Sequence, residues 1–250
     1  MTYEENGFYY YKTKVHSFQL DQQKNLSIVA VSELLQEVAG THANDFGFGY
    51  KNVIEKDLVW IITAMRVEIK KLPIWDEEIT IKTWLVDINR YFSNRQFQIL
   101  NKMGDVVISA STNWLLYNFK TRRPQNISSM NFNVKLHGDY LSVKKAVKTD
   151  KSTISEGVTS SITVKYSDLD MVSHMNNTRY FRSIIDSYNF DFHKTHFLKS
   201  FDIQFRNEAV YNDELEIFTK EISSNSFHHE IKKRKDSKSN CYCKLEWESL

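Results

Sequence analysis

Residues Tyr166–Tyr188 read YSDLDMVSHMNNTRYFRSIIDSY, and the spacing of apolar side chains changes halfway along this stretch. Up to its first residue, Ile162, Val164 and Tyr166 alternate with polar neighbours, which is the spacing of a β-strand. Further on, apolar side chains fall on one face at helical spacing, at Tyr180, Phe181, Ile184, Ile185 and Tyr188. We therefore expect a strand that leads through a polar loop into a helix beginning at about Asn177.

The polar loop brings titratable side chains to the expected start of that helix. Asn176 and Asn177 are of the residue type that caps the first N–H groups of a helix. Asp170 and His174 precede them, and unpaired N–H groups at a helix start favour a developing negative charge. A histidine, a nearby carboxylate and a helix start could together polarise a carbonyl, since histidine titrates near neutral pH. Ordinary capping next to a surface histidine has the same spacing, so the residues alone leave both interpretations open.

The same motif resembles a known family. DLD at Asp168–Asp170, HMNN at His174–Asn177, and then Tyr180 resemble the second-half motif of acyl-acyl carrier protein (ACP) thioesterases. STNWLLY around Trp114 and TRRP ending at Pro124 also resemble family segments, so the likeness runs from near Phe8 to near Trp247. The resemblance implies an α+β protein of two tandem hot-dog domains, each a long helix wrapped by an antiparallel sheet. It also implies release of fatty acids from their carrier.

An internal repeat is visible in the letters. MRVEI at 65–69 and WDEEITIKT at 75–83 match FDIQF at 201–205 and YNDELEIFT at 211–219, at a constant offset of 136 (201 − 65). This offset places Leu72 opposite Glu208. Aligning the helices by Leu34 and Phe181, an offset of 147, places Ser27 opposite His174 and Asn25 opposite Val172. The first copy therefore lacks both the His and the Glu, which predicts one active site, built mainly by the second copy.

The repeat and the periodicity divide the chain into an N-terminal hot-dog domain at 1–120, a linker at 121–160 and a C-terminal hot-dog domain at 161–250 that carries the catalytic residues. The expected helices cover 26–45 and 177–189, the first because its apolar residues recur at helical spacing. The expected strands lie at 8–18, 58–70, 78–86, 91–100, 106–118, 162–166, 201–206, 214–221, 226–234 and 240–247.

The resemblance also implies roles for single residues. Glu208 lies in FRNEAVYNDEL, where the family has a catalytic Glu followed by a Cys, but Ala209 occupies the Cys position here. Hydrolysis would then use activated water, with Glu208 as general base directly or through His174. Asp170 and His174 would hold the water and the thioester in line. Without the resemblance, Glu208 is better explained as an exposed carboxylate at a strand end.

The start of the second helix would complete this site. Asn176 and Asn177 are predicted substrate-binding residues, and backbone N–H groups near Asn177 would stabilise the oxyanion. The sequence departs from the plant enzymes at Val172, since those enzymes carry Asn two residues before the His. A valine side chain cannot orient water, so the sequence leaves open how the catalytic roles are divided among the remaining groups.

Composition limits partners and location. The net charge of +2 gives no general field for nucleic acid or membrane, and no stretch is long enough to span a bilayer, so a cytoplasmic protein is expected. No metal or cofactor is expected, because a thiolate leaves readily and the histidines are scattered. Cys241 and Cys243 lie two apart in a predicted strand, too close for an unstrained disulfide, and are interpreted as free thiols.

The expected partners are acyl carrier protein and a fatty acyl thioester, with a homodimer as an open alternative to a monomer. Three functions compete: an acyl-ACP thioesterase, another hot-dog enzyme such as an acyl-CoA thioesterase or a dehydratase, and a non-catalytic acyl-binding protein. The long fused chain and the Glu208 and His174 pair favour the first, whereas Val172 keeps the binding-only alternative open.

Overall fold

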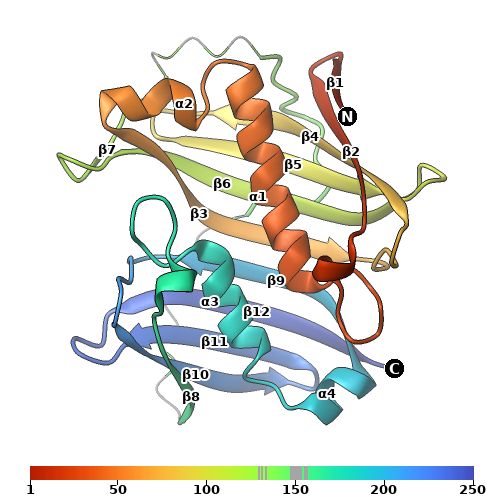
Figure 1. Ribbon diagram of the computed structural model, residues 1–250, viewed down its shortest axis with the longest axis vertical. Helices are drawn as coiled ribbons and strands as arrows, with labels where there is room; N and C mark the ends of the chain where they lie inside the picture. Colours follow the sequence, from red (N-terminus) through yellow and green to blue (C-terminus); the bar gives the residue numbers. More distant parts are fainter. Residues whose placement is uncertain (129, 131, 133, 147–153, 155–156) are drawn as a thin grey trace. The chain divides into compact units, whose positions relative to one another are not determined.

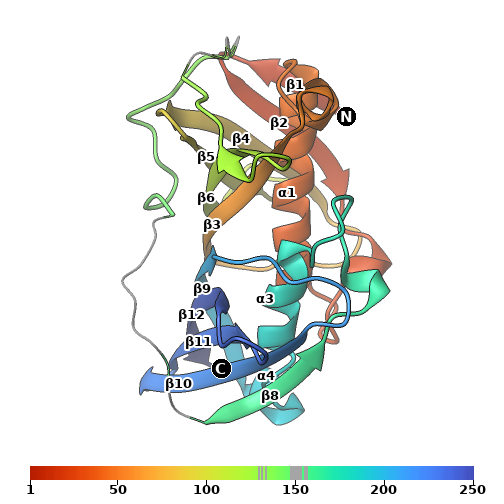
Figure 2. The same ribbon diagram turned by 90° about the vertical axis from the view of Figure 1, so that its left-hand side faces the viewer.

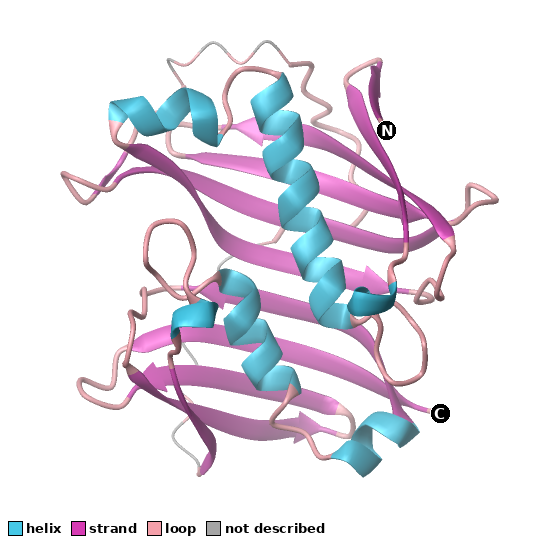
Figure 3. Ribbon diagram, viewed as in Figure 1, coloured by secondary structure: helices cyan, strands magenta, loops and turns pink. Residues whose placement is uncertain are grey.

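The computed structural model describes residues 1–250 except 129, 131, 133, 147–153 and 155–156. Contacts within the chain divide it into two compact units, Met1–Val147 and Lys148–Leu250. Each unit is an antiparallel sheet with a helix laid across one face, as predicted (Figures 1 and 3). None of the described helices is long and apolar enough to cross a membrane.

The first unit builds its sheet in the strand order β1-β2-β4-β5-β6-β3, with the short β7 paired to β6. Its helix begins where Ser27 caps it, with the Ser27 Oγ accepting from the Ala30 N–H at 3.1 Å. The elements are β1 (Thr2–Glu5), β2 (Phe8–Lys14), α1 (Ile28–Asp45), α2 (Tyr50–Val53), β3 (Leu58–Ile69), β4 (Glu78–Ile88), β5 (Phe92–Leu100), β6 (Val106–Asn118) and β7 (Arg123–Pro124), with 3₁₀ turns at Ser17–Gln19 and Ile54–Lys56.

The core of this unit lies between α1 and the sheet. Val31, Leu35 and Val38 recur at helical spacing along α1 and are fully buried. Alternate residues of β4 and β5 face them, since a strand presents every second side chain to one side. A helix with one apolar stripe thus buries that stripe against a sheet, as the sequence pattern indicated.

The second unit repeats this plan in the strand order β9-β12-β11-β10-β8. Its elements are β8 (Val158–Thr163), a 3₁₀ turn at Tyr166–Asp168, α3 (Asn177–Ile185), α4 (Phe190–Thr195), β9 (His196–Phe205), β10 (Glu214–Ser223), β11 (Ser226–Lys233) and β12 (Ser239–Ser249). The expected helix from 177 to 189 was too long. It ends at Ile185, because Asn189 caps the next helix by accepting from the Phe192 N–H at 2.8 Å.

The chain after β6 was predicted to be a linker from residue 121 to 160. Much of its described part packs on the first unit, on the sheet face opposite α1 (Figure 2). The buried Gln96 carboxamide accepts from the N–H groups of Ser142 at 3.0 Å and Val143 at 3.2 Å. Residues 147–153 and 155–156 of the predicted linker lie outside the described residues. The three-part division of the chain stays a prediction.

Candidate active site

His174 is presented by a tight loop that Asp170 organises. The Asp170 N–H donates to the His174 carbonyl at 2.7 Å, and Ser173 takes a left-handed conformation with φ 63° to close the turn. The Asp170 carboxylate lies inside the turn, where one oxygen accepts from the N–H groups of Val172 at 2.9 Å and His174 at 3.1 Å. The loop that carries His174 is therefore fixed by its own backbone and one carboxylate.

Glu208 reaches His174 through a backbone contact between their neighbours in sequence. The Met175 N–H donates to the Ala209 carbonyl at 2.8 Å, which joins the loop to the segment following β9. The residues just before this bonded pair are His174 and Glu208, and their side chains meet with Nε2 3.4 Å from Oε2. Both side chains are about one-third exposed, at 33% and 37%, so water reaches the pair. The structure thus brings together two residues that lie 34 positions apart (208 − 174).

The two predicted substrate-binding asparagines lie at the start of α3. Asn176 is the N-cap, and its Oδ1 accepts from both the N–H and the hydroxyl of Thr178 at 2.9 Å. Asn177 is the first residue of the helix. The helix start follows the His174 loop directly, so its backbone N–H groups lie close to His174 in sequence. A substrate-binding role for either side chain stays a prediction.

The first unit contains the same loop but lacks the histidine and the glutamate. Asp21 Oδ1 accepts from the N–H groups of Gln23 and Asn25, both at 2.9 Å, Lys24 has φ 65°, and the Leu26 N–H donates to the Pro73 carbonyl at 2.7 Å. Every one of these features matches one in the His174 loop. The shared scaffold shows that neither the loop nor its aspartate requires a histidine.

The matching caps Ser27 and Asn176 set the offset between the helices at 149 (176 − 27), so the predicted offset of 147 was wrong. Asn25, not Ser27, corresponds to His174. The cause is Ser32, which occupies the buried position equivalent to Phe181, with its hydroxyl bonded to the Val29 carbonyl at 2.7 Å. Matching apolar letters selected the less buried Leu34 instead. The conclusion that the first copy lacks both the His and the Glu is unchanged.

The position after Glu208 offers no nucleophile. Ala209 is fully buried, and the two thiols, Cys241 and Cys243, lie buried in β12 without a disulfide. Burial raises the pKa of both thiols, which keeps them protonated. Val172 is half-buried and its N–H is bonded to Asp170, so the backbone at this position already belongs to the loop scaffold.

One polar residue near Glu208 was not singled out by sequence reasoning. Asn240 in β12 is fully buried, and its Nδ2 donates to the carbonyls of Asn207 and Glu208, both at 3.1 Å. The only sequence signal is an asparagine at the beginning of a predicted strand, which is unremarkable by itself. Among the described residues, no group of three or more His, Cys, Asp or Glu side chains is placed to hold a metal ion.

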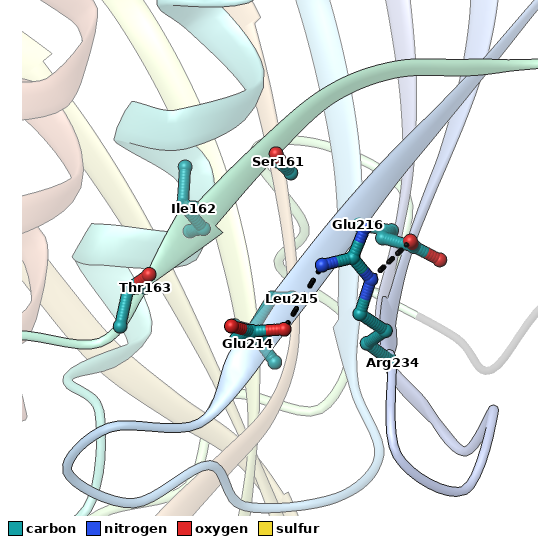
Figure 4. A pocket seen from close by; sticks show the side chains of 7 residues that line it. All are labelled: Ser161, Ile162, Thr163, Glu214, Leu215, Glu216 and Arg234. Atoms are coloured by element: carbon teal, nitrogen blue, oxygen red, sulfur yellow. Dashed lines mark hydrogen bonds and ion pairs between the residues drawn. The ribbon is translucent and has the colours of Figure 1, made fainter.

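A surface hollow on the second unit is lined by other residues than His174 and Glu208 (Figure 4). Its Arg234 donates to Glu214 and Glu216, each at 3.0 Å, so its charge is neutralised. The hollow is lined by Ser161, Ile162, Thr163, Glu214, Leu215, Glu216 and Arg234. None of these is a predicted site residue.

Family models match both halves of the chain. Residues 7–131 match the family model described as the acyl-ACP thioesterase N-terminal domain, and residues 151–249 match that of the C-terminal domain. The chain belongs to the acyl-ACP thioesterase family. The resemblance drawn from the motif around His174 is thereby confirmed.

Two plant relatives and one solved structure illustrate the likeness. The chain is 28% identical to a chloroplastic palmitoyl-acyl carrier protein thioesterase of Gossypium hirsutum and 27% identical to a chloroplastic oleoyl-acyl carrier protein thioesterase of Arabidopsis thaliana, over 85% and 86% of its length. It spans 54% and 64% of the length of these two relatives. An acyl-ACP thioesterase structure from Bacteroides thetaiotaomicron matches at TM-score 0.89 and 27% identity, covering 97% of this chain and 98% of that one. The predicted tandem hot-dog fold is confirmed.

Proposed function

We propose that this acyl-ACP thioesterase family member hydrolyses fatty acyl-ACP to free fatty acid and carrier protein, in fatty acid biosynthesis. The observation that carries the proposal is the water-accessible contact of His174 and Glu208 at 3.4 Å, in a chain that matches both family domains. The relatives named above act, by their names, on palmitoyl and oleoyl thioesters of the carrier protein. Acyl carrier protein and a fatty acyl thioester are the proposed partners.

In the proposed reaction Glu208 is the general base. Its carboxylate takes a proton from water, the water oxygen bonds to the thioester carbon, and the carbon–sulfur bond then breaks. His174 would donate from Nε2, which lies 3.4 Å from the Glu208 carboxylate, and would hold that carboxylate toward the reacting water. The departing thiolate of the carrier takes the water's proton from Glu208, which returns the carboxylate to its starting state. The buried Ala209 beside Glu208 supports this water-based route over a thiol nucleophile.

The helix start and the loop would supply the rest of the site. Backbone N–H groups of the first turn of α3 would stabilise the oxyanion. They lie at the positive end of the helix, where a developing negative charge is favoured. Asn176 and Asn177 would line the acyl thioester there. Asp170 acts in this proposal as a positioning residue, since one of its carboxylate oxygens is bonded to the N–H groups of the loop.

Two variants test the proposed chemistry. We expect His174→Ala and Glu208→Gln each to lower the rate of fatty acid release by at least about 10²-fold, the usual scale for losing an acid–base group. Asn25→Ala, at the position equivalent to His174 in the first unit, is the matched control and should retain the wild-type rate. Full activity of Glu208→Gln would refute the general-base assignment.

Substrate identity needs a panel of thioesters. Fatty acid release should be measured on matched acyl-ACP and acyl-CoA substrates of several chain lengths, and we expect the carrier-bound series to have the higher kcat/KM. Equal or higher kcat/KM on acyl-CoA would assign the chain to acyl-CoA hydrolysis instead. Binding of acyl-ACP without turnover would identify an acyl-binding protein. Cytoplasmic location and a homodimer stay predictions, tested by cell fractionation and light scattering.

A further inference from the structure

Asn240 binds the Glu208 segment with both its backbone and its side chain. Its carbonyl accepts from the N–H groups of Arg206 at 2.9 Å and Asn207 at 3.4 Å. Its side-chain Nδ2 donates to the carbonyls of Asn207 and Glu208, both at 3.1 Å. One fully buried residue of β12 thus determines where the peptide groups next to the Glu208 side chain lie.

The first unit shows that the fold does not need this carboxamide. The Val107 carbonyl accepts from the N–H groups of Lys70 at 2.9 Å and Lys71 at 3.3 Å, which is the backbone pattern of Asn240 at the equivalent positions. Val107 is buried, and the residue after Lys71 is Leu72, where the second unit has Glu208. An apolar side chain therefore suffices at this point of the scaffold, and the carboxamide occurs in the copy that carries the glutamate.

Tyr180 is a second buried polar residue that stands where the first unit has an apolar one. It is the fourth residue after the N-cap of α3, and the fourth residue after the N-cap of α1 is the fully buried Val31. The Tyr180 hydroxyl is buried close to the Ala209 backbone and the Asn240 carboxamide. Tyr180 Oη and Asn240 Oδ1 are both buried without a hydrogen-bond partner of good geometry among the described residues.

Buried polar groups are normally paired, and they lower stability where an apolar residue would serve. A sequence that keeps two of them where its own repeat has valines retains them for function rather than for folding. Both lie against the segment that carries Glu208, and the His174 side of the site is already fixed by Asp170. The Glu208 side needs an equivalent restraint, because a carboxylate displaced by about 1 Å loses much of its catalytic effect.

We propose that Asn240, supported by Tyr180, is a positioning residue that holds the backbone of Glu208 so that its carboxylate stays at His174. The inference rests on the proposed function, in which Glu208 is the general base. Asn240 touches neither water nor substrate in this role and acts entirely through the peptide groups of Asn207 and Glu208.

A double-mutant cycle with Glu208→Gln tests this role. Asn240→Val copies the first unit, and Asn240→Asp keeps the shape but removes both donors. We expect each to lower kcat on an acyl-ACP thioester by about tenfold or more, the scale of a misplaced catalytic group, with little change in KM. In the Glu208→Gln background the same changes should cause no further loss, because there is no base left to position. Tyr180→Phe should lower kcat by a smaller factor and raise or preserve Tm.

Gln96→Leu is the matched control, since Gln96 is also a fully buried carboxamide bonded to backbone groups, but in the first unit. It should lower Tm and leave kcat unchanged. An equal fold-loss from Asn240→Val in both backgrounds, or unchanged kcat in a folded Asn240→Asp protein, would overturn the inference while the proposed function stands. Full activity of Glu208→Gln would instead overturn the general-base assignment, and the inference with it, whereas absence of fatty acid release from every acyl-ACP thioester by the unaltered protein would overturn the proposed function. If Asn240→Val does not fold, the cycle is read from Asn240→Asp and Tyr180→Phe.

Discussion

The same aspartate occurs in the loops of both units, which allows one substitution to be made twice. Asp170→Ala and Asp21→Ala each remove a carboxylate oxygen that accepts from two backbone N–H groups. The donors lie at 2.9 and 3.1 Å in the second unit and at 2.9 Å in the first. Both aspartates are half-buried. The structural loss is therefore nearly equal, and only the Asp170 loop carries His174.

The magnitude follows from the two hydrogen bonds. A bond to a charged acceptor contributes about 1.5 to 3 kcal/mol, and water replaces part of it at a half-buried site, so we expect each variant to lose about 1 to 3 kcal/mol of unfolding free energy. In Asp170→Ala the N–H of His174 also loses its acceptor, so the backbone of His174 is no longer held by a side chain. If the productive loop conformation costs a further 1.4 kcal/mol or so to reach, the rate falls about tenfold, and a loss of about 3 kcal/mol would lower it about a hundredfold.

Denaturant unfolding and fatty acid release are measured on both variants. We expect similar stability losses, with kcat reduced about ten- to hundredfold in Asp170→Ala and unchanged in Asp21→Ala. Asp170→Asn, which keeps a side-chain oxygen acceptor, should recover part of the rate. Equal activity in the two alanine variants would refute the positioning role of Asp170. A loss in Asp170→Ala far beyond the hundredfold limit, not recovered at all by Asn, would instead mean that its carboxylate takes part in the reaction.

Two further predictions follow from buried titratable groups. Because Cys241 and Cys243 are fully buried in β12 and burial raises their thiol pKa, their alanine variants should keep the wild-type rate and a thiol reagent should label them only in denaturant. Labelling is measured by mass spectrometry, and stoichiometric inactivation of the folded protein by the reagent would contradict this prediction. Burial lowers the pKa of His42 to about 2 and of His229 to about 3, so the unfolded chain binds protons below pH 6.5 that the folded chain does not, and stability falls with pH from 6.5 downward. Between pH 6.5 and 5 each imidazole should cost up to about 2 kcal/mol, and His42→Gln should flatten the decline in denaturant unfolding; an unchanged slope would contradict the assignment.

Much of the fold was predictable because its signals are local. The strand β6 (Val106–Asn118) has the predicted bounds, and α1 begins two residues after the predicted start because Ser27 caps it. The end of α3 was misjudged for a local reason as well. Tyr188 continues the apolar spacing of the helix, but Asn189 interrupts it by capping a new one. Short elements such as β1 and α4 contain too few residues for periodicity to appear.

The site was predictable only in part. The letters around His174 identify a loop before a helix, but nothing in them indicates which carboxylate the histidine meets. Glu208 was paired with it through the family resemblance. The structural reason is the Met175 to Ala209 backbone bond, which joins segments that no local pattern connects. Asn240 was missed for the same reason, since its importance comes from two carbonyls that it contacts in the segment following the neighbouring strand β9.

The repeat explains how one chain can hold a single site on a duplicated scaffold. In both units the loop is closed by an aspartate, a left-handed residue and a backbone bond to the segment after the first long strand, and none of these depends on the side chains that differ. Chemistry can therefore be gained or lost by side-chain replacement without disturbing the fold. Each polar residue so introduced lowers the stability of its own unit, which confines such residues to the copy that uses them. Four of the replacements in the second unit lie at or next to the proposed site, and they are His174 for Asn25, Glu208 for Leu72, Asn240 for Val107 and Tyr180 for Val31.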